Sequence, residues 1–420
     1  MILIKNGRVV DPVSQTDQVM DILLDQGKIL ELGENLSAPE AQVIDASGLV
    51  VAPGLVDSHV HFRDPGFTYK EDIYTGAKAA AKGGVTTVIL MANTKPAVDN
   101  VETLEYVIQK GKETDINILT TANVTCGMQG KELVDMDLLA DHGAVGFTDD
   151  GLPIMDEKVL YMALLKAKKM NMPVSLHEED PMFVKEPGVN MGKISAQLNY
   201  GGASHTAEDI MVARDCVLAL ETGARLCIQH LSSGVSVELL RTFQKLGADV
   251  HAEATPHHFT LTEEAVLEYG TNARMNPPLR TAKDREEIIQ GIVDGTIDMI
   301  VTDHAPHSAE EKAKPMGQAP SGITGIETSL ALGIKSLVQP GHISLMKLIE
   351  LMSTNPMKFY NLEPGTIQKG AQADLVIFGQ DQEWVVDHYA SKASNSPFTG
   401  WSLPGKIHYT LCQGKVVYEA

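Results

Sequence analysis

Residues 54–61 read Gly-Leu-Val-Asp-Ser-His-Val-His, an apolar run that ends in His59 and His61. Side chains alternate along a strand with a period of two, so both histidines point to the same face. Neutral imidazole is a good ligand for zinc and similar divalent ions. A second apolar run ends in Val-Thr-Asp-His-Ala-Pro-His at residues 301–307, which places Asp303 where it can complete such a site. This pair of segments predicts a metal-dependent hydrolase.

The composition limits the classes of partner. The 420 residues carry 34 Lys and Arg against 55 Asp and Glu, a formal net charge of −21 at pH 7. A surface this acidic argues against nucleic acid and anionic membranes as partners, and an anionic substrate would need a local cationic pocket. The four cysteines are widely spaced, and no apolar run approaches the ~20 residues that span a bilayer. We therefore expect a reduced, cytoplasmic chain.

The middle of the chain alternates apolar, strand-like runs with amphipathic helical stretches. Helical periodicity is clear at 157–170 and 207–221, where apolar residues recur at i, i+3 and i+4. Eight strand–helix units predict an α/β fold, a (β/α)8 barrel of the TIM type. An open doubly wound sheet is the alternative, although no Gly-x-Gly-x-x-Gly follows the first strand to indicate a dinucleotide site. The predicted strands are 55–61, 85–91, 116–122, 144–148, 173–177, 225–230, 249–254 and 298–303.

Both ends of the chain read as short strands separated by turns. Asn6-Gly7 and Gln26-Gly27 predict hairpin turns near the N-terminus, and Gln413-Gly414 predicts one near the C-terminus. Neither end is large enough for a good core alone, so we expect them to pack together as a small β-sandwich. The expected domains are this accessory unit, residues 1–52 and 365–420, and a hydrolase barrel, residues 53–364.

Potential metal ligands fall at the C-terminal ends of the predicted strands, where barrel enzymes keep their active sites. A single histidine at a strand end is as often a core residue as a ligand, so the agreement among strands carries the prediction. Four histidines and two carboxylates can hold two metal ions, which polarise a carbonyl and generate hydroxide at neutral pH. The candidates are His59, His61, Asp149 or Asp150, His177, His230 and Asp303.

Longer motifs narrow the interpretation. Residues 54–66 resemble the signature of the cyclic amidohydrolases. Met-Ala-Asn-Thr-Lys-Pro at 91–96, Met-Asn-Pro-Pro-Leu-Arg at 275–280 and Asp-His-Ala-Pro-His at 303–307 are more specific. Together they make nearly the whole chain resemble the dihydroorotase family of the amidohydrolase superfamily, in its long bacterial type (class I). The chain departs from that family at Ser321, where an aromatic residue is usual.

The resemblance implies two Zn²⁺ ions per subunit. His59, His61 and Asp303 would hold one ion and His177 and His230 the other, with Asp150 and a hydroxide bridging them. Many relatives, including hydantoinases and allantoinases, bridge their metals with a carbamylated lysine, but the fourth-strand segment here ends in Asp-Asp-Gly without a lysine. The residues alone leave open which aspartate bridges. The motif match favours Asp150, which would put Asp149 on the other face of the strand.

The resemblance further implies reversible hydrolysis of the cyclic amide of (S)-dihydroorotate to N-carbamoyl-L-aspartate, in de novo pyrimidine (UMP) biosynthesis. Asp303 would accept the proton of the attacking hydroxide and deliver it to the leaving nitrogen. Arg63 lies two residues beyond His61 and therefore faces the same pocket, where a guanidinium can clamp a carboxylate. The other predicted substrate contacts are His61, Asn93, Asn276, His307, Ser321 and Gly322, the last two in a candidate lid after the eighth strand.

Two alternatives compete with this interpretation. A different cyclic amidohydrolase, such as a hydantoinase (dihydropyrimidinase) or an allantoinase, would act on rings without a carboxylate and leave Arg63 without a partner. A metal-free relative that only scaffolds aspartate transcarbamoylase would lack ligands, whereas all six are present here. An association with that transcarbamoylase alongside catalysis stays open. We expect a homodimer because small closed oligomers are common.

Overall fold

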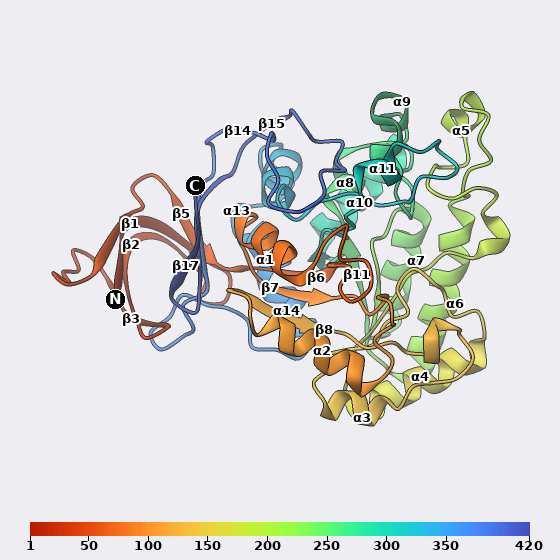
Figure 1. The fold of residues 1–420 in the computed structure, drawn as a ribbon, viewed down its shortest axis with the longest axis horizontal. Coiled ribbons are helices and arrows are strands. Elements are labelled where there is room, and N and C mark those ends of the chain that lie inside the picture. The colour runs from red at the N-terminus through yellow and green to blue at the C-terminus, as the bar shows by residue number, and fades with distance from the viewer.

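The computed structural model describes all 420 residues and shows two units side by side (Figure 1). Helices surround a set of parallel strands in the larger unit. The two ends of the chain come together beside it in a mixed sheet, so segments far apart in the sequence are neighbours in space.

The parallel strands close into a ring in sequence order. β6, β7 and β8 pair in parallel, and so do β9, β10, β11 and β12. Phe147 joins the two groups by bridging Ala122 and Val174, and His304 closes the ring by pairing with Val60. The predicted (β/α)8 barrel is therefore confirmed. Its strands are β6 (Leu55–Val60), β7 (Val85–Leu90), β8 (Asn117–Thr120), β9 (Val174–Leu176), β10 (Leu226–Ile228), β11 (Val250–Ala254) and β12 (Met299–Ile300).

Two of the predicted strands are much shorter than expected. Within 144–148 no extended strand forms. Phe147 bridges Ala122 and Val174, and the N–H groups of Val145 and Thr148 donate to the carbonyls of Thr120 and Ala122. β12 keeps two residues of the predicted 298–303. Asp303 adopts a φ of 47°, a left-handed conformation that does not continue a strand.

The helices that cover the ring begin at capping side chains. The Asp72 carboxylate accepts a hydrogen bond from the Thr75 N–H at the start of α1, and Asp156 caps α4 in the same way. The predicted helices over 157–170 and 207–221 are confirmed as α4 and α6. No helix combines the length and apolarity needed to cross a bilayer. The longer helices are α1 (Ile73–Lys82), α2 (Val101–Gly111), α3 (Met136–Asp141), α4 (Glu157–Met170), α6 (Thr206–Thr222), α7 (Gly234–Lys245) and α10 (Ala282–Asp294). The shorter ones are α5 (Lys193–Gln197), α8 (Pro256–Thr260), α9 (Ala265–Tyr269), α11 (Ala309–Lys312), α12 (Ser329–Gly333), α13 (Leu345–Ile349) and α14 (Asn355–Phe359).

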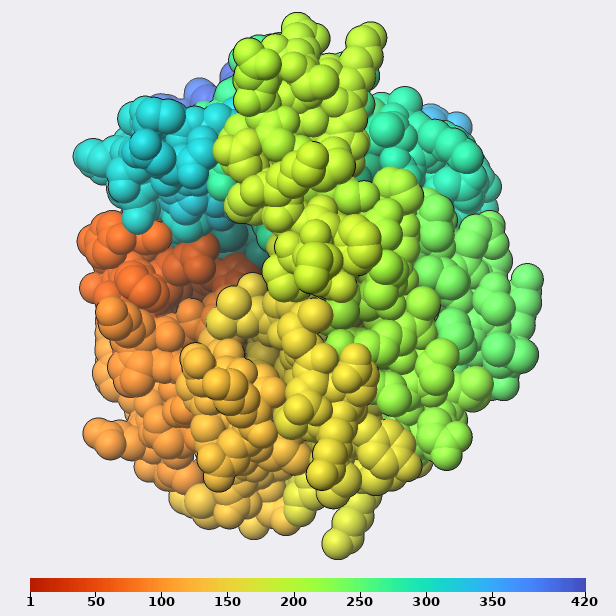
Figure 2. Space-filling model, turned by 90° about the vertical axis from the view of Figure 1, so that its right-hand side faces the viewer, coloured from red at the N-terminus to blue at the C-terminus, as the bar shows by residue number.

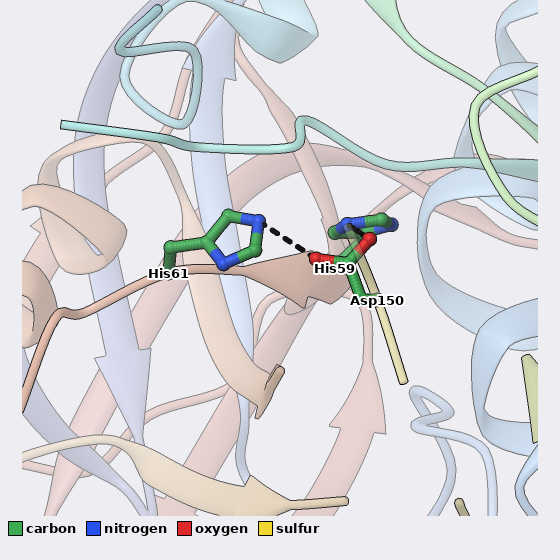
Figure 3. Close-up of side chains that lie close together, drawn as sticks. All are labelled: His59, His61 and Asp150. Atoms are coloured by element: carbon green, nitrogen blue, oxygen red, sulfur yellow. Dashed lines mark ion pairs between the residues drawn. The ribbon is translucent and has the colours of Figure 1, made fainter. Parts of the chain in front are cut away.

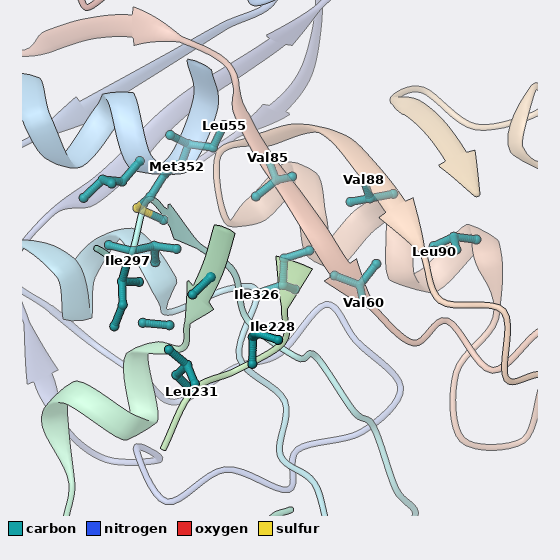
Figure 4. Packing of buried hydrophobic residues seen from close by; sticks show 14 of the residues in the cluster. Leu55, Val60, Val85, Val88, Leu90, Ile228, Leu231, Ile297, Ile326 and Met352 are labelled. Atoms are coloured by element: carbon teal, nitrogen blue, oxygen red, sulfur yellow. The ribbon is translucent and has the colours of Figure 1, made fainter. Parts of the chain in front are cut away.

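The main hydrophobic core lies between the barrel strands and these helices. Figure 4 shows Leu55, Val85 and Val88 from the first two strands packed in the same cluster as Ile228 and Met352. These side chains are at most a few per cent exposed, so their burial fixes the strands against the helices. The strand ends, and the polar residues on them, are held in place by this core.

The terminal segments form one sheet in the order β17-β16-β13-β5-β1-β2-β3, with β4 paired to β1. Its central strands are buried on both faces. Leu375 and Ile377 of β13 pack in a second core made only of terminal residues, whereas Val376 and Phe378 pack in the barrel core. The sheet therefore joins the two units. Its strands are β1 (Ile2–Asp11), β2 (Thr16–Asp25), β3 (Lys28–Gly33), β4 (Gln42–Asp45), β5 (Val50–Pro53), β13 (Leu375–Gly379), β16 (Lys406–Cys412) and β17 (Lys415–Glu419); β14 (Trp384–Val385) and β15 (Ser402–Leu403) pair separately.

One predicted turn is wrong. Asn6-Gly7 is a β-bulge inside β1, where the pairing with β2 shifts register, and not a hairpin turn. Asn6 adopts the left-handed conformation, and its N–H donates to the Asp21 carboxylate at 2.8 Å, which satisfies the bulged backbone. The turns at Gln26-Gly27 and Gln413-Gly414 are where they were expected. The domain boundaries at 52/53 and 364/365 stay a prediction.

Candidate metal centre

The predicted ligands converge at the C-terminal end of the barrel. His59 lies in β6 and His61 immediately after it, while Asp150 follows the Phe147 position. His177 and His230 follow β9 and β10, and Asp303 follows β12. Each strand thus delivers its polar side chain to the same end of the ring, as the barrel geometry requires.

Asp150 is the point at which two groups of ligands meet. His59, His61 and Asp150 form one group, and Asp150, His177 and His230 form the other. Within each group the ligand atoms all lie within 4.8 Å of one another, and every side chain is buried. Figure 3 shows His61 and Asp150 facing each other, with His59 beside them. Asp303 joins the first group, with its Oδ1 2.9 Å from His61 Nε2 and 3.7 Å from His59 Nε2.

The spacing of these atoms fits zinc. Two ligand atoms on a tetrahedral zinc are roughly 3.3 Å apart when each bond is about 2.0–2.1 Å long. The Asp150 oxygens lie 3.5 Å from His59 Nε2 and 3.4 Å from His61 Nε2. On the other side, His177 Nδ1 and His230 Nε2 are 3.1 Å apart. The donor set and its spacing therefore suit a pair of divalent ions that share Asp150.

A buried carboxylate prepares His59 for this role. Glu253 Oε2 lies 2.9 Å from His59 Nδ1, and neither residue is exposed to solvent. If the Nδ1 proton is donated to Glu253, the lone pair of Nε2 points toward Asp150 and Asp303. His59 Nε2 is buried and has no hydrogen-bond partner within the protein. Such an orphaned buried nitrogen is what a metal ligand presents without its metal.

Glu253 was not predicted from the sequence. The available signal was a carboxylate between Ala252 and Ala254, on a predicted barrel strand. Glu179 was missed as well. Its carboxylate lies 3.6 Å from His177 Nε2 and also accepts a hydrogen bond from the Asn276 amide. It therefore links a ligand to a predicted substrate contact.

Asn93, which was predicted as a substrate contact, connects two of the predicted metal ligands. Its Oδ1 is 3.0 Å from His61 Nδ1, and its Nδ2 donates to Asp150 Oδ2 at 2.9 Å. The amide thus holds the His61 ring and the Asp150 carboxylate in one orientation. A contact of Asn93 with substrate stays a prediction.

The two neighbouring aspartates point to different places. Asp149 accepts hydrogen bonds from the N–H groups of Val124 and Thr125 and from the Thr125 hydroxyl. It therefore organises the loop after β8, while Asp150 faces the histidines.

The electrostatics of the centre favour added positive charge. Burial opposes the charged form of His59, yet Asp150 and Glu253 raise its pKa well above the ordinary value. Burial also opposes the charged form of Asp150. The surrounding histidines, above all His59, outweigh burial and hold the pKa of Asp150 far below the usual range. Burial and the adjacent His177 lower the pKa of His230. A bound divalent cation would stabilise this centre, because it takes the place of the protons that the closely spaced imidazoles otherwise share.

A cleft of about 210 Å³ opens over the ligands. In Figure 2, which looks onto the face away from the terminal sheet, a hollow is visible between the segment after β6 (orange-red) and the 305–322 loop (cyan). All predicted site residues line the cleft except His59 and His307. The lining residues are His61, Arg63, Asn93, Asp150, Gly151, His177, His230, Asn276, Asp303, Ala305, Ser321 and Gly322.

Arg63 supplies a cation to this cleft. Its Nε donates to the Pro306 carbonyl at 3.3 Å, and no carboxylate forms an ion pair with it. Burial lowers the pKa of the guanidinium, while Asp303 and Asp150 act in the opposite direction. The side chain is thus a partly desolvated charge without an anionic partner in the protein.

Ser321 and Gly322 line the cleft, and His307 lies behind them, with its Nε2 3.4 Å from Arg63 Nη2. His307 Nε2 lies 2.8 Å from the Ser321 carbonyl, and the Lys70 ammonium lies 3.2 Å from His307 Nδ1. Gly322 has a φ of 125°, and a Cβ there would stand 2.6 Å from Ala305 Cβ, so only glycine fits. The Gly322 N–H donates to the Arg274 carbonyl. Contacts of these residues with substrate stay predictions.

Three cleft residues other than glycine have left-handed backbone. Arg63, His230 and Asp303 have φ values of 58°, 32° and 47°. A residue with a Cβ pays a conformational penalty of about 1–3 kcal/mol in such regions, which persists when the surrounding structure enforces it. The coincidence of three such residues at one cleft supports a functional constraint there.

Comparison with known proteins gives a consistent result. The model of the Amidohydrolase family matches residues 50–417. The curated dihydroorotase of Clostridioides difficile (strain 630) is 60% identical over 421 residues, with 100% of both chains covered. The dihydroorotase of Clostridium acetobutylicum is 49% identical, also with 100% of both chains covered. Among solved structures, the L-hydantoinase (dihydropyrimidinase) from Arthrobacter aurescens superposes with a TM-score of 0.89 at 28% identity, covering 100% of this chain and 96% of that one.

Proposed function

Because the chain belongs to the amidohydrolase family, and within it to the dihydroorotases, we propose that its cleft catalyses the reversible hydrolysis of (S)-dihydroorotate to N-carbamoyl-L-aspartate. The chain is an enzyme of the cyclic amidohydrolase type that acts on a small molecule. The observation that supports the substrate most directly is Arg63, a cation in the cleft without a carboxylate partner. Dihydroorotate brings that carboxylate on its ring. We place the reaction in pyrimidine biosynthesis.

The metal centre would hold two zinc ions. His59, His61 and Asp303 would bind one, His177 and His230 the other, and Asp150 both. When bound, the ions would supply Lewis-acid activation of the ring carbonyl and of the attacking water. Glu253 and Asn93 fix the orientation of the ligands and prepare the site for the metal.

The protein side chains then orient the substrate and move one proton. Arg63 would clamp the ring carboxylate, with Asn93 and His307 beside it and Asn276 at the amide edge of the ring. Asp303 would take the proton of the attacking water and deliver it to the ring nitrogen as the carbon–nitrogen bond breaks. In ring closure the same carboxylate moves the proton in the opposite direction.

A hydantoinase activity is the competing proposal, because the superposed hydantoinase shares the whole fold. Uncharged rings would leave the Arg63 guanidinium desolvated and unpaired in the complex, which is unfavourable. A purely structural role beside aspartate transcarbamoylase is disfavoured, since all six ligands are in place. We propose a homodimer in the cytoplasm, where the four free cysteines would stay reduced, and leave a complex with the transcarbamoylase as an addition to catalysis.

Turnover by the purified, zinc-loaded protein tests the proposal. Dihydroorotate and carbamoyl-aspartate are assayed in both directions, with hydantoin and allantoin in parallel. Activity on the first pair alone, lost with a chelator and restored by zinc, supports both substrate and metal. Activity on the uncharged rings alone would keep the metal centre and overturn the substrate.

A further inference from the structure

Three consecutive carbonyls at the edge of the cleft are held by side-chain donors. The Lys312 ammonium donates to the carbonyls of Pro320 and Gly322, each at 3.0 Å. Between them, the Ser321 carbonyl lies 2.8 Å from His307 Nε2. The Asn395 amide also donates to the Gly322 carbonyl, at 3.0 Å.

Lys312 is an unusual group to find in this position. Its side chain belongs to α11, is 6% exposed, and pairs with no carboxylate. Its only partners are backbone carbonyls, the third being that of Arg274 at 3.4 Å. An unpaired ammonium is costly to bury, and a lysine on a surface loop ordinarily reaches solvent. Here it turns inward and organises the loop instead.

The same segment is tied to two other loops through Arg274. The Gly322 N–H donates to the Arg274 carbonyl, while the Arg274 guanidinium donates to the Tyr200 hydroxyl at 2.6 Å and to the Met316 carbonyl. Loops that follow the fifth, seventh and eighth strands therefore meet at this point. Lys312 lies behind their junction and does not itself line the cleft.

The fixed carbonyls determine where the N–H groups point. A trans peptide directs its C=O and N–H to opposite sides. With the Pro320 carbonyl directed to Lys312, the Ser321 N–H faces away from the ammonium, on the side where Ser321 lines the cleft. That N–H has no acceptor within the protein. It is a free donor in the cleft that Arg63 also lines, and both residues contact His307.

We propose that Lys312 is a positioning residue for the substrate, whose ammonium fixes residues 320–322 so that the Ser321 N–H meets the anionic end of the ring. This role rests on the proposed function, which supplies the substrate. It is additional to that function, because Lys312 acts through the backbone and contacts neither the substrate nor the metal ligands.

The charge of Lys312 changes in the working pH range. Burial, and then Arg274, lower the pKa of its ammonium to about 7, with Glu311 opposing. The other charged or titratable groups that face this junction are His307, Lys70 and Arg63, and burial together with the nearby cations keeps the His307 ring neutral. Deprotonation of Lys312 weakens its hydrogen bonds to the carbonyls, because charged donors bind more strongly than neutral ones. The loop should therefore loosen as pH rises above about 7.

The test compares Lys312→Met with Lys314→Met, an exposed lysine two residues away that serves as a matched control. Hydrogen exchange of residues 313–324 should accelerate in K312M and stay at the wild-type rate in K314M. For dihydroorotate, KM should rise about tenfold in K312M, the size of one lost positioning hydrogen bond, with kcat within about twofold. The KM of the wild-type enzyme should rise between pH 6.5 and 8.5. The KM of K312M should not show this rise, because the variant has no ammonium to deprotonate.

The outcomes separate the two proposals. An inert wild-type enzyme overturns the proposed function, while exchange still shows whether Lys312 holds the loop. Unchanged exchange in K312M overturns the clamp, and faster exchange with an unchanged KM overturns the positioning role. If K312M does not fold, wild-type exchange at pH 6.5 and 8.5, corrected for intrinsic rates, replaces it. Equal protection at both pH values then contradicts the proposal.

Discussion

Replacing Arg63 with methionine removes the cation that we assign to the substrate carboxylate. The guanidinium lines the cleft, donates to the Pro306 carbonyl at 3.3 Å and forms no ion pair in the protein. Truncating one member of a desolvated charge pair costs about 2–5 kcal/mol, which corresponds to a fall in kcat/KM of about 30-fold to several thousand-fold. The cleft is open to solvent, so we expect about a hundredfold to a thousandfold loss for dihydroorotate.

The free energy of unfolding should respond differently. No carboxylate loses its partner in R63M, and a partly desolvated cation disappears, so stability should be unchanged or higher. Methionine also keeps an unbranched side chain at a residue whose φ is 58°, so the backbone penalty is similar.

Steady-state kinetics and thermal unfolding together check this reasoning. Arg63→Lys keeps the charge but loses the two-pronged geometry, so its kcat/KM should lie between those of wild type and R63M. Residual activity on an uncharged ring, if the wild type has any, should survive in R63M. Retention of kcat/KM within threefold, or an equal loss on charged and uncharged rings, would refute the assigned contact.

The remaining predictions concern the metal centre and the barrel base. Glu253→Gln should lower zinc affinity about 10–100-fold, as measured by competition with a chromophoric chelator, whereas Glu238→Gln on the surface of α7 should not. Asp150→Ala should abolish stoichiometric zinc binding; Asp149→Ala should keep the metal but lower the melting temperature, because loop residues 124–125 lose their acceptor. Burial opposes the charged form of His251, but Asp249 and Asp298 raise its pKa to about 9. Its contribution to stability should be full below pH ~6.5 and vanish as pH rises through about 9, so His251→Gln should cost roughly 1–2 kcal/mol of unfolding free energy at pH 6 and nothing near pH 10. Equal destabilisation at both pH values would contradict the assignment.

Sequence patterns were sufficient to predict the barrel and the convergence of the candidate ligands at its C-terminal end. His59 and His61 are recognisable because the period of a strand places them on one face, and the other ligands because they end apolar runs. The fourth strand was predicted at the right place but too long, because Phe147 is the one residue there that bridges both neighbouring strands. Asn6-Gly7 has the composition of a hairpin turn, but the pairing of β1 with β2 on both sides converts it into a bulge.

The residues that were missed act through contacts between distant segments. The role of Glu253 can be recognised only when the structure shows that its side chain reaches His59 inside the ring. The role of Lys312 can be recognised only when the structure shows that its loop folds back on residues 320–322. A charged residue in a strand or loop gives no local sign of which way it points. Such supporting groups follow from tertiary structure, whereas ligands at strand ends follow from local periodicity.

The pairing of β5 with β13 has a consequence for synthesis on the ribosome. These strands come from opposite ends of the chain, and they alternate side chains between the barrel core and the terminal core. Until residues 375–379 emerge, β5 lacks one of its two neighbouring strands, and the side chains of Val50 and Ala52 lack the packing that β13 provides. A nascent or prematurely terminated chain would therefore carry an intact set of metal ligands on an unfinished, aggregation-prone body.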